Sequence, residues 1–395
     1  MIINEKRALA YIVAIDEIRP IDGYDRVEHA RVGGWWIIIS KNDNLHVGDK
    51  CVYFEIDSRC PATDERFAFL EKRNYKVKTI KMCKVFSQGL LMPLCEFPEL
   101  GEDPEIHTDV TEKLGVTYAV AADNERKANK VNKDKKYQSM AARYAKLFKK
   151  PFFRWLMRRE WGRKLLFVFF GKEKDNPRGW PTGKFPHVTK TDEERVENMP
   201  WVLGYENPLI ITEKLDGTSC TYILERLGKN KYEFYVCSRN VRMADEKQEY
   251  YHDHNIYWDL AFKYDIENKL KWYLEQHPDM TYACIQGEGV GSVQGNPLKL
   301  TEDDLYVFNF IDSRMGRWPS NLGSDLIHEY FGMKWVPILD YHYMMPTDME
   351  EFKQFATAKS AVNPNVLREG IILRDPVTGL SFKNVSREFL MKKGE

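Results

Sequence analysis

Short apolar or alternating runs, separated by turn residues, fill the first hundred positions of the chain. They cover residues 8–15, 35–40, 50–56, 76–83 and 89–94. Glycine pairs and aspartate–glycine steps stand between the runs, which is typical of strands joined by turns. Five short strands in residues 1–100 predict a small closed barrel, and an OB-like barrel is the natural candidate.

The pattern changes after residue 100. Residues 96–105 are acidic and contain two prolines, which indicates a linker. Residues 124–164 are rich in lysine and arginine interleaved with aromatic residues, and parts of this stretch have helical periodicity. We therefore expect residues 101–184 to form a basic, aromatic helical linker or insertion. It suits single-stranded or A-form nucleic acid through phosphate contacts and stacking, or it is a helix with a solvated charged face.

Strands and helices alternate from residue 185 to residue 395. The pattern predicts strands at 209–212, 220–225, 232–237, 282–287, 305–311, 370–373 and 380–383, and a helix at 258–276. Thr191 and Glu194 have capping-box spacing, so a short helix is also expected there. This order predicts a mixed sheet with flanking helices. The whole chain is thus expected to be α+β, with domains at 1–100, 101–184 and 185–395.

The composition of the chain excludes some classes of protein. The formal net charge is zero, with 59 basic and 59 acidic residues, which excludes a uniformly basic nucleic-acid binder but allows a local patch. One candidate is the set of lysines at 76, 78, 81 and 84, which could equally be a solvated strand face. The seven cysteines are scattered, and no signal peptide or bilayer-spanning run appears. We expect no membrane association and a cytoplasmic location, in a cell or in the cytoplasm of a host.

The strongest chemical signal is an apolar run that ends on Lys214, followed by Leu215, Asp216 and Gly217. Alternation along a strand places Lys214 and Asp216 on the same side, and Gly217 permits a tight turn. A lysine in a half-buried pocket loses proton affinity through desolvation and nearby cations, and its neutral amine is a nucleophile. Taken alone, the same residues also fit a surface lysine beside a turn.

Further segments end apolar strands on polar side chains. They are residues 237–240, 285–288, 306–310, 368–374 and 381–383. With residues 214–217, and in this order, they resemble the motifs of the covalent nucleotidyltransferase superfamily of ATP-dependent ligases and capping enzymes. In that pattern residues 214–217 are similar to motif I, 238–240 to motif Ia, 306–310 to motif III, 369–371 to motif IV and Lys383 to motif V. Ser381 departs from it, because motif V usually carries a lysine there.

The narrower resemblance is to ATP-dependent RNA ligases, on residues 190–195 and 286–289. One group of these ligases has its OB domain ahead of the transferase domain, as expected here. The sequence ends soon after Lys383, so we expect no C-terminal OB domain of the kind found in DNA ligases and capping enzymes.

The resemblance implies a role for each matching residue. Lys214 would carry AMP, Asp216 and Lys383 would assist it, and Asp216, Glu288 and Glu369 would hold Mg²⁺ or Mn²⁺ through waters. The nucleotide would be bound by Lys214 and by Arg195, Glu213, Arg239, Glu288, Phe308, Glu369 and Lys383. Each of these residues also has a plainer interpretation, such as a solvated carboxylate, a surface salt bridge or, for Phe308, a core aromatic.

The sequence therefore predicts an ATP-dependent RNA ligase. It would join RNA 3′-hydroxyl and 5′-phosphate ends through lysyl-AMP and adenylylated RNA, in nicked duplexes above all. ATP, a divalent Mg²⁺ or Mn²⁺ and RNA are the expected cofactors and partner, and we expect a monomer. The alternatives are a DNA ligase, a capping-type nucleotidyltransferase, or a non-catalytic nucleic-acid-binding protein.

Overall fold

The structure is a computed structural model of the 395-residue chain. The residues it describes are 1–3, 6–119, 156, 159, 166, 185–189, 192–243 and 255–393. The chain divides into two compact units. One comprises residues 1–56, 78–110 and 178–395, and the other comprises 57–77 and 111–177. Residues 120–184 of the predicted helical insertion, apart from 156, 159 and 166, therefore lie outside the described residues.

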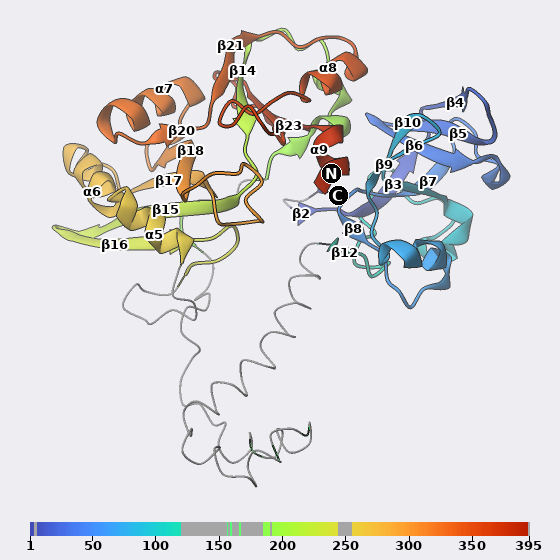
Figure 1. Ribbon diagram of the computed structural model, residues 1–395, viewed down its shortest axis with the longest axis horizontal. Helices are drawn as coiled ribbons and strands as arrows, with labels where there is room; N and C mark the ends of the chain where they lie inside the picture. The colour runs from blue at the N-terminus through green and yellow to red at the C-terminus, as the bar shows by residue number, and fades with distance from the viewer. Residues whose placement is uncertain are drawn as a thin grey trace. The chain divides into compact units, whose positions relative to one another are not determined.

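Antiparallel strands make up the N-terminal part of the first unit (Figure 1). Their bounds are β1 (Ile2–Ile3), β2 (Lys6–Arg7), β3 (Ala10–Ala14), β4 (Glu17–Ile21), β5 (Tyr24–Val32), β6 (Trp35–Ser40), β7 (Lys50–Phe54), β9 (Thr79–Met82), β10 (Val85–Gln88) and β11 (Leu90–Pro93). They pair in the orders β11-β7-β3, β4-β5-β6 and β10-β9. Tyr11, Trp35 and Tyr53 are buried in the core between them. All five predicted strands are present.

The described part of the second unit is small. Strand β8 (Ser58–Arg59) pairs with β12 (Thr117–Tyr118), and a 3₁₀ helix spans Glu65–Arg73. Asp64 caps this helix by accepting a hydrogen bond from the backbone N–H of Arg66.

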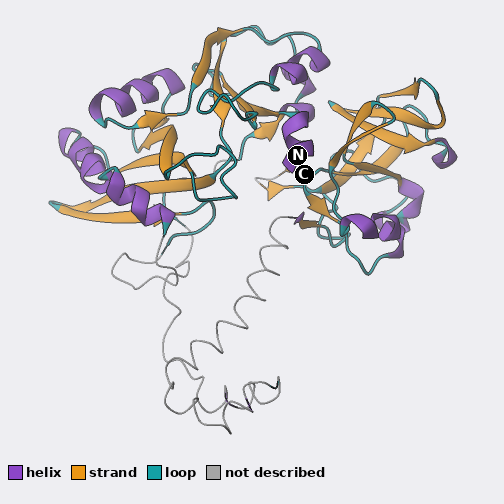
Figure 2. Ribbon diagram, in the orientation of Figure 1, coloured by secondary structure: helices purple, strands orange, loops and turns teal. Residues whose placement is uncertain are grey.

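Two sheets make up the C-terminal part of the first unit (Figure 2). Their strands are β13 (Glu194–Arg195), β14 (Leu209–Lys214), β15 (Thr218–Gly228), β16 (Lys231–Cys237), β17 (Tyr282–Val290), β18 (Asp304–Asp312), β19 (Gly316–Arg317), β20 (Lys334–Trp335), β21 (Ile338–Tyr343), β22 (Gly370–Arg374) and β23 (Ser381–Val385). One sheet has the order β13-β23-β22-β14-β21, and the other has the order β16-β15-β17-β18-β19 with β20 beside β18. The expected mixed sheet is therefore split in two, and the α+β class is confirmed.

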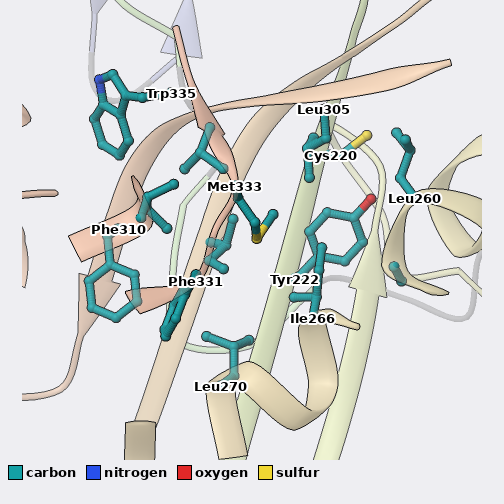
Figure 3. Close-up of a cluster of buried hydrophobic side chains, with 14 of the residues drawn as sticks. Cys220, Tyr222, Leu260, Ile266, Leu270, Leu305, Phe310, Phe331, Met333 and Trp335 are labelled. Atoms are coloured by element: carbon teal, nitrogen blue, oxygen red, sulfur yellow. The ribbon is translucent and has the colours of Figure 1, made fainter. Parts of the chain in front are cut away.

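The described C-terminal part also has five helices, the last of which packs against the N-terminal strands. They are α5 (Ile256–Lys263), α6 (Ile266–Gln276), α7 (Ser320–Asp325), α8 (Met349–Phe355) and α9 (Arg387–Lys393), with a π-helical turn at Leu326–Tyr330. Leu260 of α5 and Leu270 of α6 pack with Tyr222, Leu305 and Phe310 of the sheet in one apolar core (Figure 3). This core holds β15, β17 and β18, whose ends carry several of the predicted site residues.

Two predicted helices are wrong. The helix expected at 258–276 is two helices, because Asp265 adopts a left-handed backbone with φ of 49°. Thr191, the expected start of a short helix, lies outside the described residues. Glu194 and Arg195, which that helix would include, are extended instead and pair in parallel with Phe382 and Lys383, and a 3₁₀ helix follows at Val196–Asn198. No helix in the described part of the chain is both long and apolar enough to cross a lipid bilayer.

Candidate active site

Lys214 is the last residue of β14, at the point where this strand pairs with the start of β22. Its direct partner in the register is Gly370. The residue before that glycine, Glu369, places Oε1 2.6 Å from Lys214 Nζ. The two side chains are 27% and 15% exposed, so the pair is only partly open to solvent. Strand pairing thus brings the motif I lysine and the motif IV glutamate together.

Glu288 of β17 reaches the same place from the other sheet. Its Oε1 accepts a hydrogen bond of 3.0 Å from the backbone N–H of Gly217. This close approach needs the glycine, because a Cβ at position 217 would lie 2.2 Å from the carbonyl oxygen of Gly289. Asp216, just before the glycine, is buried. Three carboxylates therefore surround Lys214.

These carboxylates control the charge on the lysine. Burial alone would lower the pKa of Lys214, but Glu369, Glu288 and Asp216 outweigh it, and the pKa is raised. The expectation of a lowered pKa is therefore wrong for the protein without a nucleotide. The crowding also acts on Glu288, where burial, Glu369 and Asp216 together raise the pKa to about 8. The crowding therefore keeps Glu288 mostly protonated at neutral pH.

A second cluster lies around Lys383 of β23. Its Nζ is 3.2 Å from Oδ1 of Asp192, which is also 3.4 Å from Arg239 and 3.6 Å from Arg7. Burial and the cations Arg7, Arg195 and Lys214 lower the pKa of Lys383 to about 7, against the opposite effect of Asp192. Lys383, Arg7 and Arg239 in turn hold the pKa of Asp192 well below its usual range, although burial opposes this. Lys383 and Arg239 are thus gathered on one carboxylate.

Arg195 and Glu213 are both buried, and each contacts other parts of the protein interior. Arg195 is buried, lies 3.7 Å from Glu55 and stacks over Trp35 at 6.0 Å. Glu213 is buried on the opposite side of β14 from Lys214, where it accepts a hydrogen bond of 2.7 Å from the backbone N–H of Ala361. Burial raises its pKa. The nucleotide contacts suggested for these two residues stay predictions.

Phe308 lies in β18 between the buried residues Val307 and Asn309 and is itself only partly buried. Its ring packs at the edge of the apolar core. This position fits a core aromatic and also fits a ring that stacks on adenine. Its backbone carbonyl accepts a 2.6 Å hydrogen bond from Arg374, which ties β18 to β22. The two sheets are therefore joined next to the predicted adenine contact.

The carboxylates suit a divalent cation bound through waters. Within the described ranges, no group of three His, Cys, Asp or Glu residues is arranged as a direct metal cage. Glu369 Oε2, however, is buried without a hydrogen-bond partner in the described structure, and the carboxylates of Glu288 and Asp216 act on the same lysine. Mg²⁺ usually keeps several waters and takes only one or two carboxylates. The donor set fits that mode of binding.

Sequence reasoning missed two residues of the site. Asp192 lies within residues 190–195, which the resemblance to RNA ligases covers, but no role was predicted for it. Lys393, at the end of α9, donates hydrogen bonds of 2.8 and 2.9 Å to the two oxygens of Asp216. It belongs to a polar C-terminal stretch without a motif, so nothing in the sequence pattern indicated it.

Comparisons with known proteins identify both the N-terminal and the C-terminal part of the chain. The RNA ligase family model matches residues 207–392, and an OB-fold domain model matches residues 9–94. A search of curated protein sequences found no match.

Solved structures of a Naegleria gruberi RNA ligase are similar to nearly the whole chain. Its complex with PPi is 28% identical, with a TM-score of 0.72, and the match covers 98% of this chain and 99% of that one. A lysine-to-alanine variant with ATP and Mn is 27% identical, with a TM-score of 0.71, over 97% and 98% of the two chains. A glutamate-to-alanine variant with AMP and Mn is also 27% identical, with a TM-score of 0.71, over 98% and 99%.

The motif residues converge on one lysine, and the family models and the solved structures place the same two modules in the same order. The chain is thus an RNA ligase by its family match over residues 207–392, with an N-terminal OB-fold domain over residues 9–94.

Proposed function

We propose that this RNA ligase seals 3′-hydroxyl and 5′-phosphate ends through a lysyl-AMP on Lys214. The placement of Lys214 Nζ 2.6 Å from Glu369, with Asp216 and Glu288 beside it, carries the proposal. Solved structures of the Naegleria gruberi RNA ligase hold ATP with Mn, and AMP with Mn, which supports the same choice of nucleotide and a divalent cation here.

The reaction has three steps, each of which is a substitution at phosphorus. Lys214 Nζ, after losing its proton, bonds to the α-phosphorus of ATP while the bond to pyrophosphate breaks. AMP then passes to an oxygen of the RNA 5′-phosphate, which breaks the phosphorus–nitrogen bond. Finally the 3′-hydroxyl bonds to that 5′-phosphorus, its proton is released and AMP leaves. Each step depends on in-line placement and on neutralising negative charge.

The surrounding residues supply those two conditions. Lys383 and Arg239 would move from Asp192 to the phosphates of the nucleotide, because a guanidinium and an ammonium both bind phosphate oxygens strongly. Phe308 would stack on adenine from the edge of β18. Asp216, Glu288 and Glu369 would hold waters of a Mg²⁺ or Mn²⁺ ion, which would screen charge on the phosphates and on the carboxylates.

Covalent labelling tests the central step. Purified protein incubated with α-labelled ATP and Mn²⁺ should acquire an acid-labile AMP label. Lys214→Ala should lose it by at least about a thousandfold, because no other group replaces the nucleophile. Lys231→Ala, which removes an exposed lysine at the start of β16, serves as the matched control and should label normally. Label retained in Lys214→Ala would refute the assignment.

The preferred substrate is a separate matter. We propose nicked duplex RNA, because an OB-fold domain accompanies the ligase domain in this chain. Sealing rates should be compared on nicked RNA, nicked DNA and single-stranded RNA ends, with ATP or GTP. Equal rates on nicked DNA, or labelling with GTP in place of ATP, would instead favour the DNA ligase or capping alternative.

A further inference from the structure

Lys393 blocks both oxygens of the motif I carboxylate. Its ammonium donates to Asp216 Oδ1 at 2.8 Å and to Oδ2 at 2.9 Å. The side chain of Asp216 is 10% exposed and that of Lys393 is 31% exposed, so the lysine reaches in from the partly open side. A carboxylate engaged in this way has few acceptor positions left for the waters of a metal ion.

The position of Lys393 is fixed by its helix. In α9, Leu390 is buried in the same apolar core as Tyr11 and Trp35 of the N-terminal strands. Arg387 donates to Gln88 at 3.0 Å and forms two bonds of 2.6 Å with Glu350. Lys393 Nζ also lies 5.8 Å from the ring centre of Phe389. The contact with Asp216 is therefore held by an anchored element.

We propose that Lys393 is a positioning residue that acts as a displaceable counter-ion of Asp216 and competes with the divalent cation for this carboxylate. The inference rests on the role proposed above for Asp216 in the water shell of the metal. Lys393 holds the carboxylate aimed at the site before the metal binds. The metal must displace the ammonium to engage Asp216, because two cations on one carboxylate repel each other.

Competition between Lys393 and the metal for Asp216 predicts how much the Mn²⁺ affinity should change. Removing the charge of Lys393 should tighten Mn²⁺ binding about fivefold, which corresponds to ~1 kcal/mol, a reasonable value for a partly exposed ion pair. The matched control is Lys392→Gln, because it removes the same charge from the neighbouring residue of α9, which is exposed. Lys393→Arg keeps the charge and should behave like the wild type.

Mn²⁺ titration of the full-length protein, followed by the electron paramagnetic resonance signal of free Mn²⁺, tests this without any activity readout. Lys393→Gln should bind Mn²⁺ about fivefold more tightly than both the wild type and Lys392→Gln. In an Asp216→Asn background, Lys393→Gln should have no further effect, since the contested carboxylate is gone. A merely structural role of Lys393 would not produce tighter binding.

The titration separates failure of this inference from failure of the proposed function. If Asp216→Asn weakens Mn²⁺ binding while Lys393→Gln behaves like Lys392→Gln, the competition is refuted and the metal role of Asp216 stands. If Asp216→Asn leaves Mn²⁺ binding unchanged, both are overturned. Weaker binding in Lys393→Gln would also overturn the inference, because it would make Lys393 a supporter of the metal.

Discussion

At the scale of single residues, charge decides when Lys214 can react. Glu369, Glu288 and Asp216 raise its pKa, so the amine is protonated before the nucleotide binds. Lys383 is tuned the opposite way, because burial and neighbouring cations lower its pKa to about 7. The proposed nucleophile therefore carries a proton, and Lys383 is a titratable cation that acts on it. Nucleotide phosphates would change both of these pKa values.

The titration of Lys383 predicts a pH dependence of ATP binding. Below about pH 7 the lysine is charged before binding, whereas above it the lysine must take up a proton to contact phosphate. ATP affinity should thus fall as pH rises from 7 to 9, with a limiting slope of about tenfold per pH unit. Calorimetry in buffers of different ionisation enthalpy should detect this proton uptake.

Lys383→Arg is the control for this prediction, because arginine keeps its charge throughout the range. The titration of ATP itself is common to both proteins and cancels in the comparison. Equal slopes and equal proton uptake in the wild type and in Lys383→Arg would contradict the prediction.

Sequence reasoning found the site residues that end apolar strands. Lys214, Glu288 and Glu369 each border a buried strand, and pairing between strands does bring Lys214 to Glu369. Asp192 and Lys393 could not be found in this way. Their roles depend on contacts with residues 191 and 177 positions away, which no local pattern encodes.

At the scale of elements, the sequence predicts strands where one face is buried. Strand β6 has the predicted bounds, and β14 was predicted with its last two residues missing. Strand β5 was missed because its first six residues, Tyr24 to His29, are exposed or only partly buried and give no apolar signal. The break between α5 and α6 was missed because apolar residues continue across Asp265. Aspartate tolerates the left-handed backbone that ends α5 without a glycine or proline.

The pairing of β22 predicts that Gly370 cannot be replaced. A Cβ there would lie 2.3 Å from the carbonyl oxygen of Asn384 and 2.9 Å from the Cα of Val385. Gly370→Ala should push β22 away from β23, cost about 1–3 kcal/mol of unfolding free energy and displace Glu369 from Lys214. Urea unfolding and AMP labelling should both be affected.

Gly228→Ala is the matched variant for this experiment. Gly228 also lies in a strand, β15, but an added Cβ meets nothing within 4 Å. Its stability and labelling should match those of the wild type. A Gly370→Ala protein as stable and as active as Gly228→Ala would show that the strand pair can relax around the extra methyl group.

At the scale of the molecule, a buried polar network ties the N-terminal strands to the ligase segment. Lys353 of α8 is fully buried and bonds Glu197 and, at 2.6 Å, Gln88 of β10. Arg387 of α9 bonds the same Gln88 side-chain oxygen at 3.0 Å. Burial lowers the pKa of Lys353 to about 8, and Glu197 opposes this shift. These hydrogen bonds therefore join segments far apart in the sequence, and they require the charged groups of Lys353 and Glu197 to be buried.

This network predicts a marked asymmetry between single and double substitutions. Lys353→Met leaves Glu197 charged and without its cation in a buried site, which should lower the unfolding free energy by about 3–5 kcal/mol. Replacing both residues, as in Lys353→Met with Glu197→Met, should recover most of this loss, because an apolar pair needs no compensating charge. Lys359→Met, at an exposed lysine that follows α8, should change stability by less than about 0.5 kcal/mol. Urea unfolding of the wild type and of these three variants measures the differences.

If the double variant were as unstable as Lys353→Met alone, Lys353 would stabilise the protein through its packing against Trp35 and not through Glu197. Its ammonium lies 5.6 Å from the centre of that ring.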